Sequence, residues 1–444
     1  MADEYKVIRW GYPVKTNSDE CVNFIDAYFQ QVLYYGADRH IILKAGEADG
    51  ECVLANTLIA FFLAFKAHKD ALFHLHAAQC KLGVATVYEK MVFKAVSSWV
   101  EAKEPEATLD LHSQLLKDFP KDLASLKRAQ VLCFYIGRPD FSLQLVEQVL
   151  PENQDENYIY GMLSFPLLEV GRMRDAELAA RKGLAIKSDD PWSQHALCHV
   201  FQHECRFNEA VHFMETCADS WNACCSFMYT HNWWHLALCY LEGHAHLSKI
   251  FDIYDSHIWA ALQQNNVDSP QVYLNALGLL LHVHVRGNST DIHDRMRDLV
   301  VCLMDQSSWH QEWLLDLLAT WAFAYANAFS QADQLLKGMK GRVNEMQGKR
   351  RESMQRVLLL AEALYQYGKG DYTRAYDTLG PNFNVLEYKV IGASDEQLDV
   401  FEEVWCVILI NSGHISQAIQ ALERRVEIRS GVPFTWRLLV RDGF

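Results

Sequence analysis

The sequence predicts an all-α protein, an α-α superhelix of degenerate tetratricopeptide-like helical hairpins, and three observations carry this prediction. The first is a period, because Gly137, Gly171 and Cys205 open similar motifs at a spacing of 34 residues. The second is a small residue five positions after each of these anchors, namely Ser142, Ala176 and Ala210. The third is the run of apolar residues at helical spacing before each anchor. A hairpin that cannot bury its apolar face alone must stack on a neighbour, and stacking imposes a fixed period.

Each residue type in the motif has a physical reason. Glycine adopts the backbone conformation of a tight turn between two helices at low cost. A small residue five positions later lets the second helix approach the first closely. The pattern returns around Gly370 with Ala375 and around Gly413 with Ala418. The longer interval between these two glycines predicts an insertion within residues 382–397.

The same patterns divide the chain into segments. Residues 1–87 are predicted to be an N-terminal helical segment, in which Ser18 before Asp19 and Glu20 marks a helix start. Residues 88–264 are predicted to hold tetratricopeptide-like repeats with a His/Trp-rich centre. Residues 265–308 are expected to be an irregular helical connection, and residues 309–444 to hold C-terminal repeats. We expect one continuous solenoid.

Composition limits the classes of partner. The 444 residues are 50% hydrophobic, enough for a large core, and the formal net charge of −15 disfavours binding to nucleic acid or anionic lipid. The longest apolar stretch, residues 52–65, is shorter than the ~20 residues of a membrane span and predicts a buried helix. The first residues lack a basic region followed by an apolar core, so we expect no secretory signal, and the 12 cysteines form no CxxC pair. We expect a cytoplasmic protein with no nucleic-acid partner and no membrane insertion.

Two HxxxH pairs are the candidate functional centre. His195 with His199 and His231 with His235 lie on the predicted first helices of successive repeats. At this spacing both imidazoles of a pair share one helix face. Helices packed ~8–10 Å apart could bring all four rings together. The candidate binding residues are His195, His199, His231, Asn232, Trp234 and His235, with Gln202, Glu204, Glu242, Asp255 and His257 as outer partners.

Three interpretations of this centre remain open. The rings could form a hydrogen-bonded, stacked seam between helices, which is the simplest account. They could line a pocket for an organic ligand or peptide. They could also hold a divalent metal through His195, His199, His231 and His235, since imidazole is a common zinc or iron ligand. No glutamate follows the first histidine of either pair, so metalloprotease chemistry is excluded.

The chain resembles the tetratricopeptide repeat protein 38 family along nearly its whole length. The resemblance rests on "TNSDECVNFIDA" near the start, on the central "DDPWSQHALCHVF", "HNWWHLALCYLE" and "IYDSHI", and on "GASDEQLDVF", "LERR" and "PFTWRLL" near the end. It implies a fold of degenerate helical repeats, with no established reaction, substrate or partner. Gln202 stands where an acid is expected in the family.

The expected function is a scaffold that binds a protein or peptide on a concave face formed by first helices. The alternative is an enzyme, or a small-molecule or metal-binding protein, centred on His195, His199, His231 and His235. No phosphate loop, nucleophile elbow or dinucleotide fingerprint occurs, so no catalytic residue and no required cofactor is assigned. Convergent imidazole nitrogens would favour the alternative. Rings bonded to backbone carbonyls would favour the scaffold.

Overall fold

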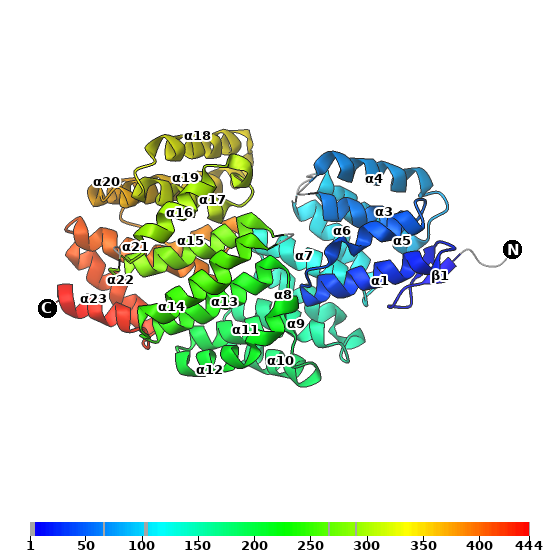
Figure 1. The fold of residues 1–444 in the computed structure, drawn as a ribbon, viewed down its shortest axis with the longest axis horizontal. Helices are drawn as coiled ribbons and strands as arrows, with labels where there is room; N and C mark the ends of the chain where they lie inside the picture. Colours follow the sequence, from blue (N-terminus) through cyan, green and yellow to red (C-terminus); the bar gives the residue numbers. More distant parts are fainter. Residues whose placement is uncertain (1–4, 65–66, 102–104, 265–266, 289–290, 444) are drawn as a thin grey trace. The chain divides into compact units, whose positions relative to one another are not determined.

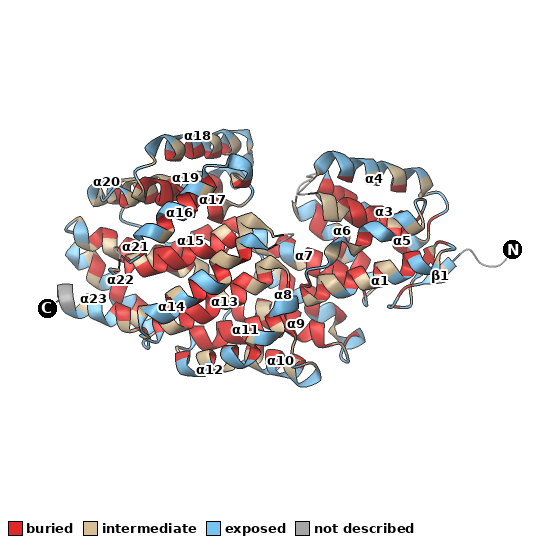
Figure 2. Ribbon diagram, viewed as in Figure 1, coloured by how far each residue is buried: buried red, intermediate tan, exposed pale blue. Residues whose placement is uncertain are grey.

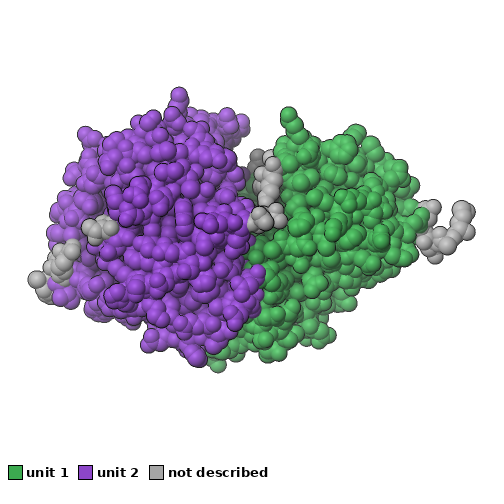
Figure 3. Space-filling view, in the orientation of Figure 1, with its two compact units in different colours: residues 1–197, 223–225 green, residues 198–222, 226–444 purple. Residues whose placement is uncertain are grey.

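The all-α prediction is confirmed in the computed structural model (Figure 1). The structure describes residues 5–64, 67–101, 105–264, 267–288 and 291–443, and of residues 441–443 it describes only the backbone. The chain divides into two compact units, residues 1–197 with 223–225 and residues 198–222 with 226–444 (Figure 3). The division falls inside one continuous helix, α11 (Pro191–His203). It therefore lies within the segment 88–264, between Gly171 and Cys205, where the 34-residue spacing gives no local sign of a boundary.

Unit 1 opens with an antiparallel hairpin of β1 (Tyr5–Val7) and β2 (Pro13–Lys15), which precedes the helices of the predicted N-terminal segment and was not itself predicted. The hairpin is held by packing, since Val14 is fully buried and the ring of Trp10 lies 4.4 Å from that of Phe29 on α1 (Asp19–Tyr34). The predicted helix start is confirmed, because the Ser18 side chain accepts a hydrogen bond from the Cys21 N–H at 3.1 Å.

The rest of unit 1 is helical. Its elements are η1 (Arg39–Ile41), α2 (Ile42–Ala48), α3 (Val53–Leu63), α4 (His68–Lys81), α5 (Val87–Val100), α6 (Pro105–Asp118), α7 (Leu123–Tyr135), α8 (Pro139–Val149), η2 (Leu150–Glu152), α9 (Asn157–Glu169) and α10 (Met173–Ile186). The buried helix predicted from the apolar stretch 52–65 is α3, with residue 65 outside the described residues.

Unit 2 continues the helical hairpins. Its elements after α11 are α12 (Phe207–Cys217), η3 (Ala218–Ala223), α13 (Ser226–Glu242), α14 (Leu247–Ile253), the π-helix η4 (Tyr254–Trp259), η5 (Ala260–Gln263), α15 (Ser269–Val285), α16 (His293–Leu303), η6 (Gln306–Ser308), α17 (Trp313–Tyr325), α18 (Phe329–Glu345), α19 (Gly348–Gly368), α20 (Tyr372–Leu379), η7 (Val385–Ile391), α21 (Asp395–Asn411), α22 (Ile415–Ile428) and α23 (Pro433–Gly443). The insertion predicted within residues 382–397 contains η7.

One turn geometry closes every hairpin from α7 to α22. A residue with positive φ follows the first helix, and the N–H after it donates to the carbonyl five residues earlier at 2.8–3.3 Å, as in the Schellman motif. The positions are Gly137, Gly171, Cys205, His244, Gly287, Asn327, Gly370 and Gly413. The glycine turn predicted from the sequence is therefore confirmed and extends to turns that lack glycine.

The expectation of an irregular connection over residues 265–308 is corrected by these turns. Its described residues contain the regular hairpin α15/α16, closed at Gly287, while residues 265–266 and 289–290 lie outside the described residues. The period lengthens from 34 residues to 39 between Cys205 and His244 and to 43 between His244 and Gly287. A fixed spacing of 34 residues therefore does not predict the α15/α16 hairpin, although its turn has the same backbone geometry as the other turns.

The first helices of unit 2 are buried more completely than the second helices (Figure 2). Every residue of α17 from Leu314 to Ala324 is buried, whereas α22 buries only Ala418, Ala421, Leu422 and Arg425, one stripe at helical spacing. The side chains of α13 and α15 are buried in the same all-round manner. The side chains that were expected to line an open concave face thus lie in the interior of unit 2.

The C-terminal hairpin of unit 2 returns to the beginning of this unit. Arg429, just after α22, donates to the backbone carbonyl of Gln202 at 3.1 Å and to Glu242 at 2.9 Å. Gly431 lies so close to Cys205 that a Cβ on the glycine would stand 2.4 Å from the cysteine Cβ. Unit 2 is therefore closed on itself by contacts between residues 187 to 227 positions apart.

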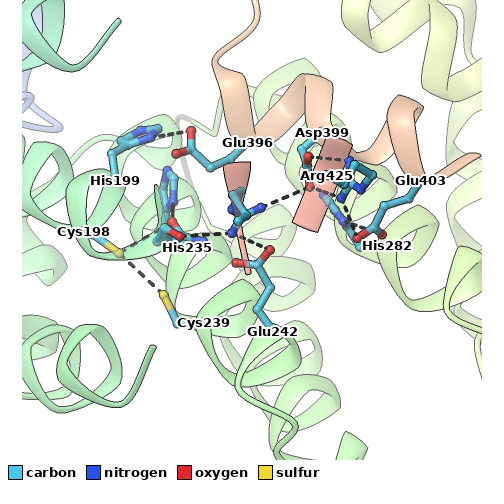
Figure 4. Close-up of polar contacts among 12 residues, drawn as sticks. Cys198, His199, His235, Cys239, Glu242, His282, Glu396, Asp399, Glu403 and Arg425 are labelled. Carbon is cyan, nitrogen blue, oxygen red and sulfur yellow. Dashed lines mark hydrogen bonds and ion pairs between the residues drawn. The ribbon is translucent and has the colours of Figure 1, made fainter. Parts of the chain in front are cut away.

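A buried chain of ion pairs makes this closure (Figure 4). Arg286, at the end of α15, donates to both carboxylate oxygens of Glu403 on α21, at 2.6 and 3.1 Å. Arg425 on α22 binds both oxygens of Asp399, at 2.8 and 3.0 Å, and Arg429 reaches the same carboxylate at 3.2 Å. Bidentate pairing of this kind fixes both distance and orientation.

Substitution of glycines in different backbone conformations tests the turn geometry. We expect Gly413→Ala, at φ +84°, to lower the free energy of unfolding by about 1–2 kcal/mol, because a Cβ is strained in the left-handed region. The control Gly341→Ala lies inside α18 with open space around it, and we expect it to raise stability by about 0.5–1 kcal/mol. Denaturant unfolding measures both, and equal effects would contradict the assignment.

The ion pairs predict how stability depends on pH. Burial alone would raise the pKa of Glu403, but attraction from Arg286, with His282 and Arg425, outweighs it and holds this pKa well below its usual range. The folded state therefore binds the proton less tightly than the unfolded chain. The stabilisation is present above the unfolded pKa of about 4.3 and is lost as pH falls towards the folded pKa.

We expect Glu403→Gln to destabilise unit 2 by about 3–5 kcal/mol at neutral pH, because it leaves a buried arginine without its anion. The variant should also lose part of the acid-induced decline in stability. Glu387→Gln is the matched control, because its pair with Arg356 is nearly half-exposed and such pairs contribute about 0–1 kcal/mol. Unfolding measured from pH 3 to 8 is the test. A similar loss in both variants would contradict the expectation.

Candidate functional site

The four histidines of the two HxxxH pairs come together. One ligand-type atom from each of His195, His199, His231 and His235 lies within 4.8 Å of the others, and all four side chains are buried. Three of them belong to unit 2, with the ring of His235 centred 4.3 Å from that of His199 and 4.7 Å from that of His231. His195 stands two residues before the division between the units, on the same continuous helix as His199.

Side-chain oxygens hold the Nδ1 atoms of the three histidines in unit 2. His199 Nδ1 lies 2.5 Å from Glu396 Oε2, as Figure 4 shows. The other two pairs are His231 Nδ1 with Asn275 Oδ1 at 2.9 Å and His235 Nδ1 with Gln202 Oε1 at 2.6 Å. These oxygens accept hydrogen bonds, so each Nδ1 carries the proton and each Nε2 carries the lone pair in the neutral ring.

The electrostatics of the site favour a neutral imidazole at His231 and an ionised carboxylate at Glu396. Burial, opposed by the hydrogen bond to Asn275, lowers the pKa of His231 to about 4. Burial would raise the pKa of Glu396, but His199 outweighs it and keeps this pKa below its usual value. Glu396 is therefore an anion at neutral pH, one side chain away from the cluster.

Trp234 and Asn232 complete the set of predicted binding residues. The indole of Trp234 stacks on His231 with centroids 5.3 Å apart and planes 6° from parallel. Asn232 is fully buried, and neither of its amide atoms has a hydrogen-bond partner among the described residues. Buried amides are normally satisfied, and an exception points to water or an ion.

Most of the residues predicted to be outer partners of the four histidines pair with other side chains. Of the five proposed, Gln202 alone bonds a histidine of the cluster. Glu204 pairs with Arg206, Glu242 with Arg429, and Asp255 with Arg295, while His257 stacks on Trp233 at 3.5 Å.

Two partners of the histidines, Glu396 and Asn275, were not predicted from the sequence. Glu396 lies 197 positions from His199, and Asn275 lies 44 positions from His231. No local spacing connects them to the histidines.

This arrangement is typical of a closed metal site. Metal-binding histidines usually donate their second ring nitrogen to a carboxylate or carbonyl oxygen, which orients the ring. Zinc–nitrogen bonds of about 2.0–2.1 Å place tetrahedral ligand atoms about 3.4 Å apart. The ligand nitrogens of this cluster lie within 4.8 Å of one another, so shifts of about 1 Å in their positions would bring them to that geometry. Rings in contact at 4.3–4.7 Å accommodate an ion among them but leave no room there for an organic molecule.

Two surface hollows lie away from the histidines. One in unit 2 is lined by Gln306, Trp309, His310, Gln334, Lys337 and Gly338, and one in unit 1 by Arg9, Asn23, Asp26, Ala27, Gln30, Glu156 and Tyr158. None of the described helices has both the length and the apolar composition to cross a membrane.

No family model matches the chain. Its fold is similar to that of a human IFIT1 dimer with m7Gppp-AAAA, at 11% identity over 95% of this chain and 94% of that chain, with a TM-score of 0.45. It is also similar to a monomeric IFIT1 mutant with Gppp-AAAA, at 12% identity over 96% and 95% of the two chains and a TM-score of 0.45. A human IFIT1 dimer with PPP-AAAA matches at 14% identity over 88% and 94%, with a TM-score of 0.38.

Likenesses at this level carry no argument about ligands, and the resemblance to the tetratricopeptide repeat protein 38 family stays a prediction. The chain is an all-α protein of tetratricopeptide-like helical hairpins, and the four histidines are its candidate site.

Proposed function

We propose that this chain is a metal-binding helical-repeat protein, with one divalent transition-metal ion held by His195, His199, His231 and His235. The observation that carries the proposal is the convergence of four buried imidazoles within 4.8 Å, three with Nδ1 against a side-chain oxygen. A stacked seam requires no such convergence. Its rings would be satisfied equally well by backbone carbonyls.

Imidazole ligands favour zinc, iron, copper or nickel over magnesium or calcium, which prefer oxygen. Zinc fits best among these, because it accepts four neutral nitrogen ligands in a tetrahedron. An ion with four imidazole ligands has no open position for substrate. The proposed role is therefore structural, with the metal stabilising the interior of unit 2.

Several earlier expectations stay predictions. A protein or peptide partner fits a repeat array, but the buried first helices of unit 2 shift the binding surface to the outer helices. The cytoplasmic location and the absence of a nucleic-acid partner rest on the sequence and the net charge of −15.

Metal content tests the proposal. Protein purified without an affinity metal and reconstituted with Zn²⁺ should contain about one ion per chain by elemental mass spectrometry, and His199→Ala/His235→Ala should contain none while keeping its helical circular-dichroism spectrum. The control pair His203→Ala/His212→Ala changes histidines of α11 and α12 outside the cluster and should keep the ion. Wild-type protein without bound metal after reconstitution would refute the proposal.

The Glu396–His199 contact gives a second prediction. We expect Glu396→Ala to weaken zinc binding about 10–100-fold, the usual effect of removing a partner that orients a metal ligand. Glu396→Gln keeps an acceptor oxygen at the same position and should weaken it less. Competition with a chromogenic chelator measures the affinity, and Glu387→Ala, exposed in the same unit, is the control. Equal affinity in Glu396→Ala and wild type would contradict the assigned role.

A further inference from the structure

The unit 2 hollow formed around η6, α18 and the loop before α17 has features that the fold alone does not require. It has a volume of about 470 Å³ and is lined by Gln306, Trp309, His310, Gln334, Lys337 and Gly338. His310 adopts φ 63°, in the left-handed region that few residues other than glycine occupy. Strained backbone of this kind concentrates at functional sites.

A buried carboxylate holds His310 in this conformation. The backbone N–H of His310 donates to one oxygen of Asp316 and the ring Nδ1 to the other, each at 2.9 Å. Asp316 is 1% exposed, and a guanidinium nitrogen of Arg342 lies 3.6 Å from its Oδ2 atom. The imidazole is thus oriented by a carboxylate that is itself fixed, while its ring is 29% exposed to the hollow.

Because Gly338 has no side chain, the ring of His310 can pack directly against α18. A Cβ at this position of α18 would stand 2.1 Å from Nε2 of His310, which is too close for any side chain. The glycine is inside a helix, where it costs about 0.5–1 kcal/mol relative to alanine. The close approach of the imidazole accounts for that cost.

The polar groups that line the hollow are mainly hydrogen-bond donors. Lys337 contributes an ammonium group, and no carboxylate of the described residues forms an ion pair with it, whereas Lys340 on the same helix pairs with Glu362 at 2.6 Å. Gln306 donates to the amide oxygen of Gln334 at 3.1 Å, which leaves the NH₂ group of Gln334 as a donor.

No acidic side chain lines the hollow, and the ring of Trp309 forms an apolar wall, with its N–H bonded to the Leu303 carbonyl at 2.8 Å. We propose that this hollow binds a small organic oxyanion, a carboxylate or phosphate group on an apolar body. The oxyanion accepts hydrogen bonds from Lys337 and Gln334, the apolar body packs on Trp309, and the His310 ring forms part of the wall. The site is independent of the metal centre.

Isothermal titration calorimetry on the full chain tests this proposal with phenyl phosphate and phenylacetate as probes. We expect at least one of them to bind saturably at one site, and we expect Lys337→Gln to weaken that binding at least tenfold. Gly338→Ala should weaken it by a similar factor, because the new methyl group displaces His310. Lys340→Gln removes the same charge from the same helix outside the hollow and should leave affinity within twofold.

Two further probes separate the contributions of charge and apolar packing. Benzylamine has the same ring with a positive charge and should not bind, while inorganic phosphate lacks the apolar body and should bind at least tenfold more weakly than phenyl phosphate. The proposal is overturned if neither organic anion binds, if benzylamine binds as well as the anions, or if Lys340→Gln has the effect of Lys337→Gln. Lys337 is exposed, so its variant decides the question even if Gly338→Ala does not fold.

Discussion

Unit 2 depends on the buried contacts between arginines and carboxylates that hold its C-terminal hairpin against its earlier helices. Taking an ion out of water costs several kcal/mol, so these groups are tolerated only where pairing is complete. Arg286 with Glu403 and Arg425 with Asp399 meet this condition through two hydrogen bonds each. If α21 packed in a shifted position, buried charges would be left unpaired. The ion pairs therefore favour one position of α21 against the earlier helices.

The histidine cluster depends on the same closure. Glu396 lies on the first turn of α21, one turn before Asp399, so the ion pairs that dock α21 also position the carboxylate beside His199. The cluster itself is built from α11 and α13, but the carboxylate in contact with His199 comes from α21. A metal bound at the histidine cluster would stabilise the docking of α21, because metal binding and helix docking favour each other.

Two features of unit 2 distinguish it from an open repeat array. Its first helices α13, α15 and α17 are buried on nearly all sides, and its last hairpin contacts its first. A groove between repeats would leave the inner side chains in water. Here they form an interior in which polar groups must be paired, and the fully buried amide of Asn232 is a conspicuous exception beside the histidines.

The sequence by itself determined the helical class, the turn positions with glycine and the pairing of histidines within each helix. These features depend on contacts between residues a few positions apart. Gly137 and Gly171 specify turns through their own backbone freedom, and His231 with His235 shares a face because four residues make about one helical turn.

The turn at His244, which has no glycine at the positive-φ position and lies off the 34-residue period, was not predictable, because tertiary packing and not local preference imposes its conformation. Only the tertiary structure decided the division into units, the interior position of the first helices and the identity of the partners Glu396 and Asn275. The physical reason is distance along the chain. Contacts such as that between His199 and Glu396 arise from the docking of whole helices, which leaves no periodic trace in the sequence.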